Sequence, residues 1–331
     1  IDGTESFTIS QLYAPSGWTS WLDLARLHRQ AEDALREGDH TKMAAFWNTR
    51  LARCYDVAQS VTSADKLKAR AEPYPPRVVP EQALVLTLSV DTQPDRLEVQ
   101  IEAWGPGMEH WIVDHIVLVG SPAAAPTDPE SVWAQLDRIV TTPLVHASGA
   151  LIKISAYGID SGGHNTQDVY NYAVQRRHLN CIILAGARKP NRPIIASKPS
   201  NQDIDWGGKV RQGMAELWMV GTDVAKDYIF NRIDVSAGPG AMHWHNQMPP
   251  EWYDQMCAER LVPVRYAGQL VKVWRKLSDH ARNEAIDLSV YNLAMAHKLR
   301  LHTFSHADWE RLRKKLIPET RTFDLFAQPA P

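Results

Sequence analysis

The segment ALVLTLSVDTQPDRLEVQIEAWGPGMEHWIVDHIVLV, residues 83–119, decides the fold. It holds three runs of apolar and β-branched residues, each with the length and composition of a β-strand. The connections TQPD and GPGMEH are short and rich in turn-forming residues, so the runs are predicted to form an antiparallel meander. The predicted strands span 83–90, 96–104 and 111–119, and Asp91 directly follows the first.

Helical and strand patterns alternate after this meander. Asp128 is the candidate N-cap of the next helix, and the fourth strand ends at Asp160. The order β-β-β-α-β-α-β predicts an α/β domain whose mixed sheet is flanked by helices. The elements after the meander are a helix over 128–140, a strand over 150–160, a helix over 165–177 and a strand over 180–185.

The pattern is weaker over residues 186–250, where Gly, Pro and basic residues are frequent and an irregular segment is expected. From this segment to residue 277, the sequence predicts a strand at 216–221, helices at 222–233 and 250–262, and a hairpin at 264–277. A strong helix is then predicted over 280–299. Its apolar face is formed by Ala285, Ile286, Val290, Leu293 and Ala294.

Both ends of the chain are predicted to be peripheral. Ser20 and Asp23 mark the start of a helix, which a GDH turn at 38–40 separates from a second helix running to about Arg53. The proline-rich stretch AEPYPPRVVP cannot extend a helix and is expected to be a linker. The predicted organisation is a helical region at 1–76, a main domain at 77–300 and a basic tail at 301–331 with a disordered end.

The composition excludes several classes of protein. The 331 residues, 44% of them hydrophobic, can bury a sizeable core, and no apolar run is long enough to cross a membrane. The first residues lack the pattern of a signal peptide. Because the chain starts at Ile1 rather than methionine, it is expected to be a piece of a longer protein. Cys54, Cys181 and Cys257 form no CxxC pair, which fits a reducing cytoplasm and no four-cysteine zinc site.

The net charge of −2 does not by itself indicate a nucleic-acid partner, so any DNA contact must come from local basic patches. One patch lies within residues 188–211, another precedes the last strong helix, and the tail is a third. Each could equally be a solvated loop or helix face. The candidate DNA-binding residues are Arg188, Lys189, Arg192, Lys209, Arg211, Lys272, Arg275 and Lys276.

Three acids, Asp91, Asp160 and Asp287, are the candidate catalytic and metal-binding residues. The first and fourth strands are expected to be neighbours, and the last strong helix should cross one face of the sheet. Carboxylates brought together in this way repel one another unless a cation neutralises them, and oxygen ligands suit Mg²⁺ or Mn²⁺. Two such ions, about 4 Å apart, can activate a water molecule and stabilise the leaving 3′ oxygen during phosphodiester hydrolysis.

Other residues near these acids are weaker candidates. Glu284 shares the helix face of Asp287 and is a possible supporting residue. Asp95 is either turn chemistry or a support of the metal site, and His164 either contacts a phosphate or belongs to a plain strand-to-helix turn. His243 and His245 lie on one side of a predicted strand, where structural or DNA-contacting roles are favoured over zinc.

Four segments carry a resemblance to the large terminase subunit of lambda-like phages. They are SVDTQPDRLEVQIEAWGPG (89–107), IDSGGHNTQDVYNYAVQR (159–176), LWMVGTDVAKDYIFNRI (217–233) and NEAIDLSVYNLAMA (283–296). Residues 12–51 also resemble the family's segment between its ATPase motor and its nuclease. The resemblance implies a ribonuclease-H-like nuclease at 77–300 that cuts double-stranded DNA with divalent metal. Asp91, Asp160 and Asp287 match the family's metal-binding acids, whereas Glu284 varies among relatives.

The motor's P-loop, GxxxxGK[ST], is absent from this chain, so an ATPase part is expected upstream of Ile1. The resemblance further implies action in the cytoplasm of the bacterial host. The implied partners are double-stranded DNA, the motor part of the same subunit, the small terminase subunit and the portal protein. Two alternatives remain: a Holliday-junction resolvase or recombination nuclease of the same fold, and a non-catalytic module that docks on DNA or the portal.

Overall fold

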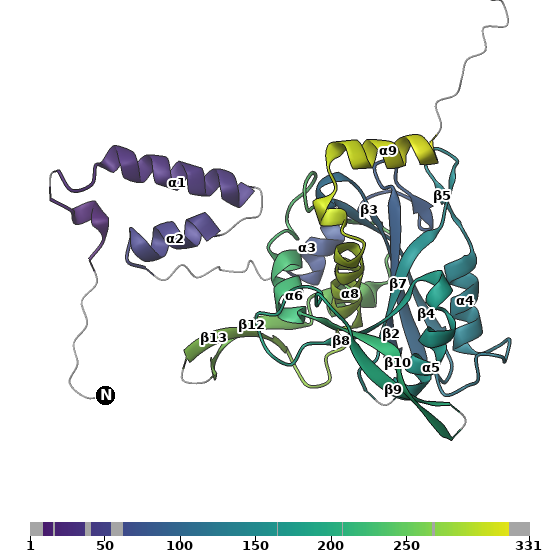
Figure 1. Ribbon diagram of the computed structural model, residues 1–331. Helices are drawn as coiled ribbons and strands as arrows, with labels where there is room; N and C mark the ends of the chain where they lie inside the picture. Colours follow the sequence, from purple (N-terminus) through teal and green to yellow (C-terminus); the bar gives the residue numbers. More distant parts are fainter. Residues whose placement is uncertain are drawn as a thin grey trace, which may run out of the picture.

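The computed structural model describes residues 9–15, 17–36, 41–53, 62–163, 165–206, 208–266 and 269–317. Within them an eight-stranded mixed sheet has helices on both faces (Figure 1), as a ribonuclease-H-like α/β domain requires. The strand order is β11-β4-β3-β2-β7-β8-β10-β9. The bounds are β2 Val85–Gln93, β3 Arg96–Trp104, β4 His110–Val119, β7 Ile154–Asp160, β8 Cys181–Gly186, β9 Ser200–Trp206, β10 Lys209–Val220 and β11 Met242–Trp244.

The predicted meander is confirmed, because β2, β3 and β4 pair in antiparallel fashion. β2 continues to Gln93, so Asp91 lies inside the strand, opposite Glu98, rather than after it. The expected neighbours β2 and β7 pair in parallel, and β8 and β10 continue the parallel set. Asp160 therefore ends its strand at the same edge of the sheet as Asp91.

The side chains of β2 alternate between two different surroundings. Leu86, Leu88 and Val90 belong to the core on the side of α4 (Val132–Thr141) and α5 (Thr166–Gln175). Thr87, Ser89 and Asp91 point to the other face, where α6 (Thr222–Phe230), α7 (Pro250–Met256) and α8 (Glu284–Lys298) lie. One face of this strand is thus apolar, and the face toward α8 is polar.

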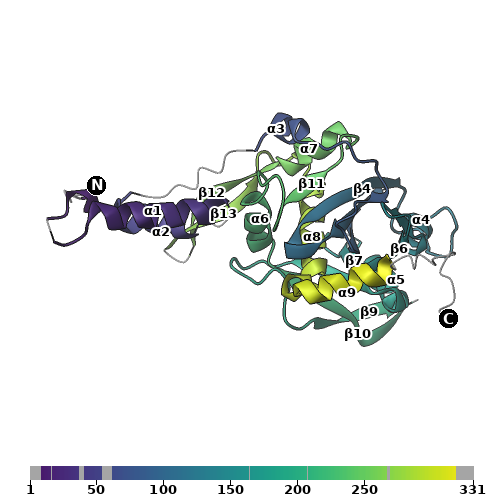
Figure 2. The same ribbon diagram turned by 90° about the horizontal axis from the view of Figure 1, so that it is seen from above.

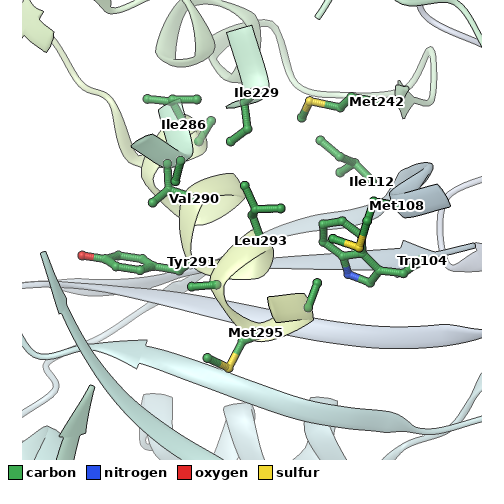
Figure 3. Close-up of a cluster of buried hydrophobic side chains, with 14 of the residues drawn as sticks. Trp104, Met108, Ile112, Ile229, Met242, Ile286, Val290, Tyr291, Leu293 and Met295 are labelled. Carbon is green, nitrogen blue, oxygen red and sulfur yellow. The ribbon is translucent and has the colours of Figure 1, made fainter. Parts of the chain in front are cut away.

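Helix α8 is buried on almost every side. The five residues of its predicted apolar face are all buried, and Figure 3 shows how Ile286, Val290 and Leu293 meet Ile229 and Trp104. It also makes polar contacts with the sheet. Asn292, which is fully buried, hydrogen-bonds to Ser89 and to the backbone carbonyl of Gln100.

Three predictions of secondary structure are corrected. The segment 186–250 is not irregular throughout: β9 and β10 form a hairpin whose largely exposed, polar side chains hide the strand pattern. The helix predicted over 250–262 ends at Met256, and β12 (Glu259–Tyr266) pairs instead with β13 (Gln269–Lys276). Ser131, not Asp128, caps α4; the Asp128 carboxylate accepts from the backbone N–H of Glu130, one turn earlier.

The N-terminal helices stand apart from the sheet (Figures 1 and 2). They are α1 (Trp21–Arg36) and α2 (Thr41–Thr49), which follow the 3₁₀ turn Gln11–Tyr13. Ser20 caps α1 as predicted, accepting from the N–H of Asp23. The second helix ends at Thr49, before Arg53, and the GDH turn and Cys54 lie outside the described residues.

Residues 62–76, the last part of the predicted helical region 1–76, pack against the sheet. Leu67 of α3 (Ala64–Ala69) is buried in the core beneath α7, and its carbonyl accepts from the indole of Trp244. The N–H of Glu72 donates to the carbonyl of Trp244 over 2.9 Å. The proline-rich stretch therefore connects two parts of one packed body.

The remaining elements cover the edges of this body. A small sheet is formed by β1 (Val78–Val79), β5 (Leu144–His146) and β6 (Leu151–Ile152). The helix expected in the tail is α9 (His306–Leu316), with a Ser305–Asp308 capping box and a buried Trp309. Short 3₁₀ turns lie at Pro106–Met108, Arg177–Leu179 and Leu301–Thr303. No helix in the described part of the chain is long and apolar enough to cross a membrane, and the predicted disordered end lies outside that part.

Candidate active site

The three predicted aspartates come from three elements and influence one another electrostatically. Asp91 lies on β2, Asp160 ends β7, and Asp287 lies in the first turn of α8. Burial, together with the negative charges of Asp160, Asp287 and Glu284, raises the pKa of Asp91 to about 7. The predicted neighbourhood of the three acids is therefore present in the structure.

Neutral hydrogen-bond donors hold two of these acids. The amide of Gln93 donates to Asp91 Oδ2 over 2.6 Å. The N–H of Gly162 donates to Asp160 Oδ1 over 3.1 Å. Burial raises the pKa of Asp160, and the negative charge of Asp287 adds to this rise. Hydrogen bonds from the N–H of Gly162 and the hydroxyl of Tyr291 oppose it. Figure 3 shows the Tyr291 hydroxyl pointing away from the apolar cluster around α8.

Asp287, in contrast, has a cationic partner. Lys226 Nζ on α6 lies 2.9 Å from Asp287 Oδ1 and 2.7 Å from Glu259 Oε1. The amide of Asn283 bridges the same two carboxylates, with distances of 2.8 Å to Asp287 Oδ2 and 2.6 Å to Glu259 Oε1. Burial lowers the pKa of Lys226, but the charges of Asp287 and Glu259 outweigh it and raise the pKa.

The sequence analysis missed Lys226, Glu259 and Asn283. A signal for Lys226 existed, because it lies between Ala225 and Ile229 on the buried side of α6, and a lysine is buried only with a partner. Asn283 is four residues before Asp287, so the two share a helix face. Glu259 had no such signal, because it was assigned to a helix rather than to the start of β12.

Glu284 lies beside the aspartates within a network of its own. Its Oε1 lies 3.1 Å from Arg96 and 3.4 Å from Arg282, and both arginines also contact the fully buried Glu98. Asp95 is exposed and pairs with Arg96 at 2.9 Å, so it reaches the site only through that arginine. The candidate His164 lies outside the described residues.

The candidate DNA-binding residues do not form one surface. Arg188, Lys189 and Arg192 line a cavity of about 970 Å³, which the glycine loop 161–163 after Asp160 also lines. Lys209 and Arg211 lie at the opposite end of β10, about 30 Å away along the strand. The third group is on the hairpin strand β13: the charge of Lys276 acts on Asp287, that of Lys272 acts on Asp227, and Arg275 is exposed.

The two candidate histidines have structural surroundings. His243 stacks on Trp111, and its ring nitrogens lie 2.5 Å from Glu72 Oε1 and 3.0 Å from Glu109 Oε1. His245 is buried, and its ring lies edge-on to that of Tyr74. His243 thus connects residues 62–76 to the sheet, which supports the structural interpretation over a zinc site.

The chemistry of the donor set fits a hard divalent cation. Among the described residues, no three His, Cys, Asp or Glu side chains are already grouped as a metal site, and Asp287 is held by Lys226 and Asn283. Nevertheless, Asp91 and Asp160 present carboxylate oxygens whose pKa values are raised by burial and by neighbouring negative charge. A divalent cation is the group that would relieve this repulsion.

Comparison with known proteins identifies a family. Residues 4–309 match the family described as terminase large subunit gpA, endonuclease domain. The large terminase subunit of Escherichia phage lambda is 28% identical over 304 residues, which are 89% of this chain and 44% of the relative. That of Enterobacteria phage P21 is 28% identical over 300 residues, which are 87% of this chain and 43% of the relative. The chain thus spans less than half the length of these relatives, and no solved structure matches it. From the match over most of its length, the chain belongs to the endonuclease-domain family of large terminase subunits.

Proposed function

We propose that this chain is a metal-dependent endonuclease that cuts double-stranded viral DNA during genome packaging. The observation that carries the proposal is that Asp91 on β2, Asp160 at the end of β7 and Asp287 on α8 lie near enough for their charges to act on one another. A cavity with a basic lining adjoins them, which suits a polyanion. The family membership supports the class of reaction.

The residues divide into those that hold the cation and those that hold DNA. Asp91, Asp160 and Asp287 would bind Mg²⁺ or Mn²⁺, which supplies the positive charge that activates a water molecule and stabilises the leaving 3′ oxygen. Gln93 and the N–H of Gly162 fix the carboxylates of Asp91 and Asp160. Arg188, Lys189 and Arg192 would hold phosphates beside the site.

The setting of the reaction follows from the relatives. Both are named as large terminase subunits and are more than twice as long as the aligned segment. We therefore expect the ATPase motor part of the same subunit, the small terminase subunit and the portal protein as partners, in the cytoplasm of the infected bacterium.

Nicking of supercoiled plasmid tests the proposal. The chain is incubated with Mn²⁺, Mg²⁺ or EDTA beside two variants, Asp91→Asn and Asp279→Asn; Asp279 is an exposed aspartate just before α8. We expect cutting with either metal, none with EDTA, and loss of cutting by at least 100-fold only in the Asp91 variant. Cutting that persists in folded Asp91→Asn overturns the assignment. Preference for branched over linear duplexes would favour a junction resolvase instead.

A further inference from the structure

We propose that the ammonium of Lys226 takes the place of a second divalent ion beside Asp287, so that the site holds a single ion, bound between Asp91 and Asp160. This inference rests on the proposed nuclease function. Its structural basis is the ammonium of Lys226, which lies within 3 Å of a carboxylate oxygen of both Asp287 and Glu259. A two-ion site would place a second metal beside one of its acids, and here a protein cation already lies beside Asp287.

The ammonium is fixed rather than mobile. The Lys226 side chain is only 8% exposed, and Glu259 is 5% exposed. Helix α6 is anchored by Ala225 and Ile229 in the core, and the β12–β13 hairpin is joined to it because the indole of Trp274 donates to Asp227. Asn283 holds the other side of the carboxylate pair. These contacts fix the lysine and both of its partners in place.

The distribution of charge leaves room for one ion. Arg96 and Arg282 balance the charges of Glu284 and Glu98, and Lys226 balances one of the two negative charges of Asp287 and Glu259. In the described part of the chain, the recorded hydrogen bonds to Asp91 and Asp160 come from neutral groups. One divalent cation balances the two negative charges of these aspartates.

A second divalent ion would meet strong repulsion. An ion bound to Asp287 Oδ1 at about 2.1 Å would lie no more than about 5 Å from the ammonium, which lies 2.9 Å from that oxygen. Two cations at that separation, in a largely buried site, repel each other strongly. Removing the charge of Lys226 would instead take away the ammonium that lies between Asp287 and Glu259, and this pair of carboxylates would then be a site for a further ion.

Counting bound Mn²⁺ tests this directly. Electron paramagnetic resonance measures free Mn²⁺ during titration of the chain, and the count needs no cutting. We expect one ion per chain in the wild type, in Lys226→Arg and in the control Lys298→Gln, whose lysine lies over Trp218 at the other end of α8. We expect two ions in Lys226→Gln, and one again in Lys226→Gln combined with Glu259→Gln.

The dependence of plasmid nicking on Mn²⁺ concentration provides a second measurement, with DNA present. The Hill coefficient should rise from about one in the wild type to about two in Lys226→Gln, with recovery of cutting only at higher Mn²⁺. Two ions per wild-type chain, or one ion in folded Lys226→Gln, overturn the inference and leave the nuclease proposal standing. No bound ion in the wild type overturns the proposed metal site itself. If Lys226→Gln does not fold, the number of Mn²⁺ ions bound by the wild type and its Hill coefficient still test the inference.

Discussion

Asn292 on α8 donates a hydrogen bond of 2.7 Å to Ser89 on β2, and this contact fixes the helix that carries Asp287 against the strand that carries Asp91. The same side chain accepts from Thr87 over 2.7 Å and donates to the carbonyl of Gln100 over 3.1 Å. Because the groups involved are buried, each bond is protected from competition by water. The spacing of the acids thus depends on a polar contact beneath the helix.

Replacement of Asn292 by alanine should therefore lower the free energy of unfolding by about 2–4 kcal/mol, since it leaves buried partners without hydrogen bonds and creates a cavity. Urea denaturation measures the loss. The control is Asn201→Ala, whose side chain is exposed on the edge strand β9, with an expected change below about 0.5 kcal/mol. A loss of similar size in both variants would show that Asn292 has no special role.

Much of the site could be predicted from sequence, because its acids end or flank elements with strong patterns. The three apolar runs of 83–119 and their short, turn-rich connections predicted the meander, and the apolar stripe of 280–299 predicted the crossing helix. The polar contacts beneath that helix were not predicted. In the sequence alone, Thr87 and Ser89 look like ordinary strand residues and Asn292 like a surface residue; their contacts are seen only once β2 and α8 are placed together. Lys226 was missed for the same reason: its partners Glu259 and Asp287 are distant in sequence.

The raised pKa of Asp91 gives a prediction for the metal-free protein. Its pKa is about 7 when folded, mainly through burial, against 3.8 for an ordinary aspartate. The folded state therefore holds this proton more tightly, and the resulting stability is fully present below pH 3.8 and is lost as pH rises to about 7. In EDTA, the wild type should lose about 2.5 kcal/mol between pH 5 and 8 relative to Asp91→Asn.

Denaturation at several pH values measures this difference, and other titrating groups cancel because they are common to both proteins. Adding Mn²⁺ should reverse the trend in the wild type alone, since the ion binds the ionised carboxylate. A difference that stays constant between pH 5 and 8 would contradict the raised pKa of Asp91.

The network around Glu284 should be important for folding. Arg96 is 21% exposed and contacts both the fully buried Glu98 and Glu284, so Arg96→Ala leaves these two buried carboxylates to share the one guanidinium of Arg282. We expect a loss of about 3 kcal/mol, as for other buried pairs that lose one partner. Arg26→Ala breaks an exposed pair with Asp23 and should cost below about 0.5 kcal/mol. Chemical denaturation measures the loss of stability in each variant. Equal losses would mean that the burial of Glu98 does not increase the contribution of its arginine partner.

DNA binding should depend on the basic residues beside Asp160 and not on those at the far end of β10. Arg188→Ala with Lys189→Ala removes two positive charges from the lining of the cavity, so the slope of log affinity against log salt should fall by about two, with weaker binding at low salt. The matched variant Lys209→Ala with Arg211→Ala removes the same charge about 30 Å away along β10, and its slope should be unchanged. Fluorescence anisotropy with a short duplex in EDTA measures both without cutting. An equal fall of the slope in both double variants would mean that DNA also contacts the β9–β10 hairpin. An unchanged slope in Arg188→Ala with Lys189→Ala would mean that DNA does not contact the cavity.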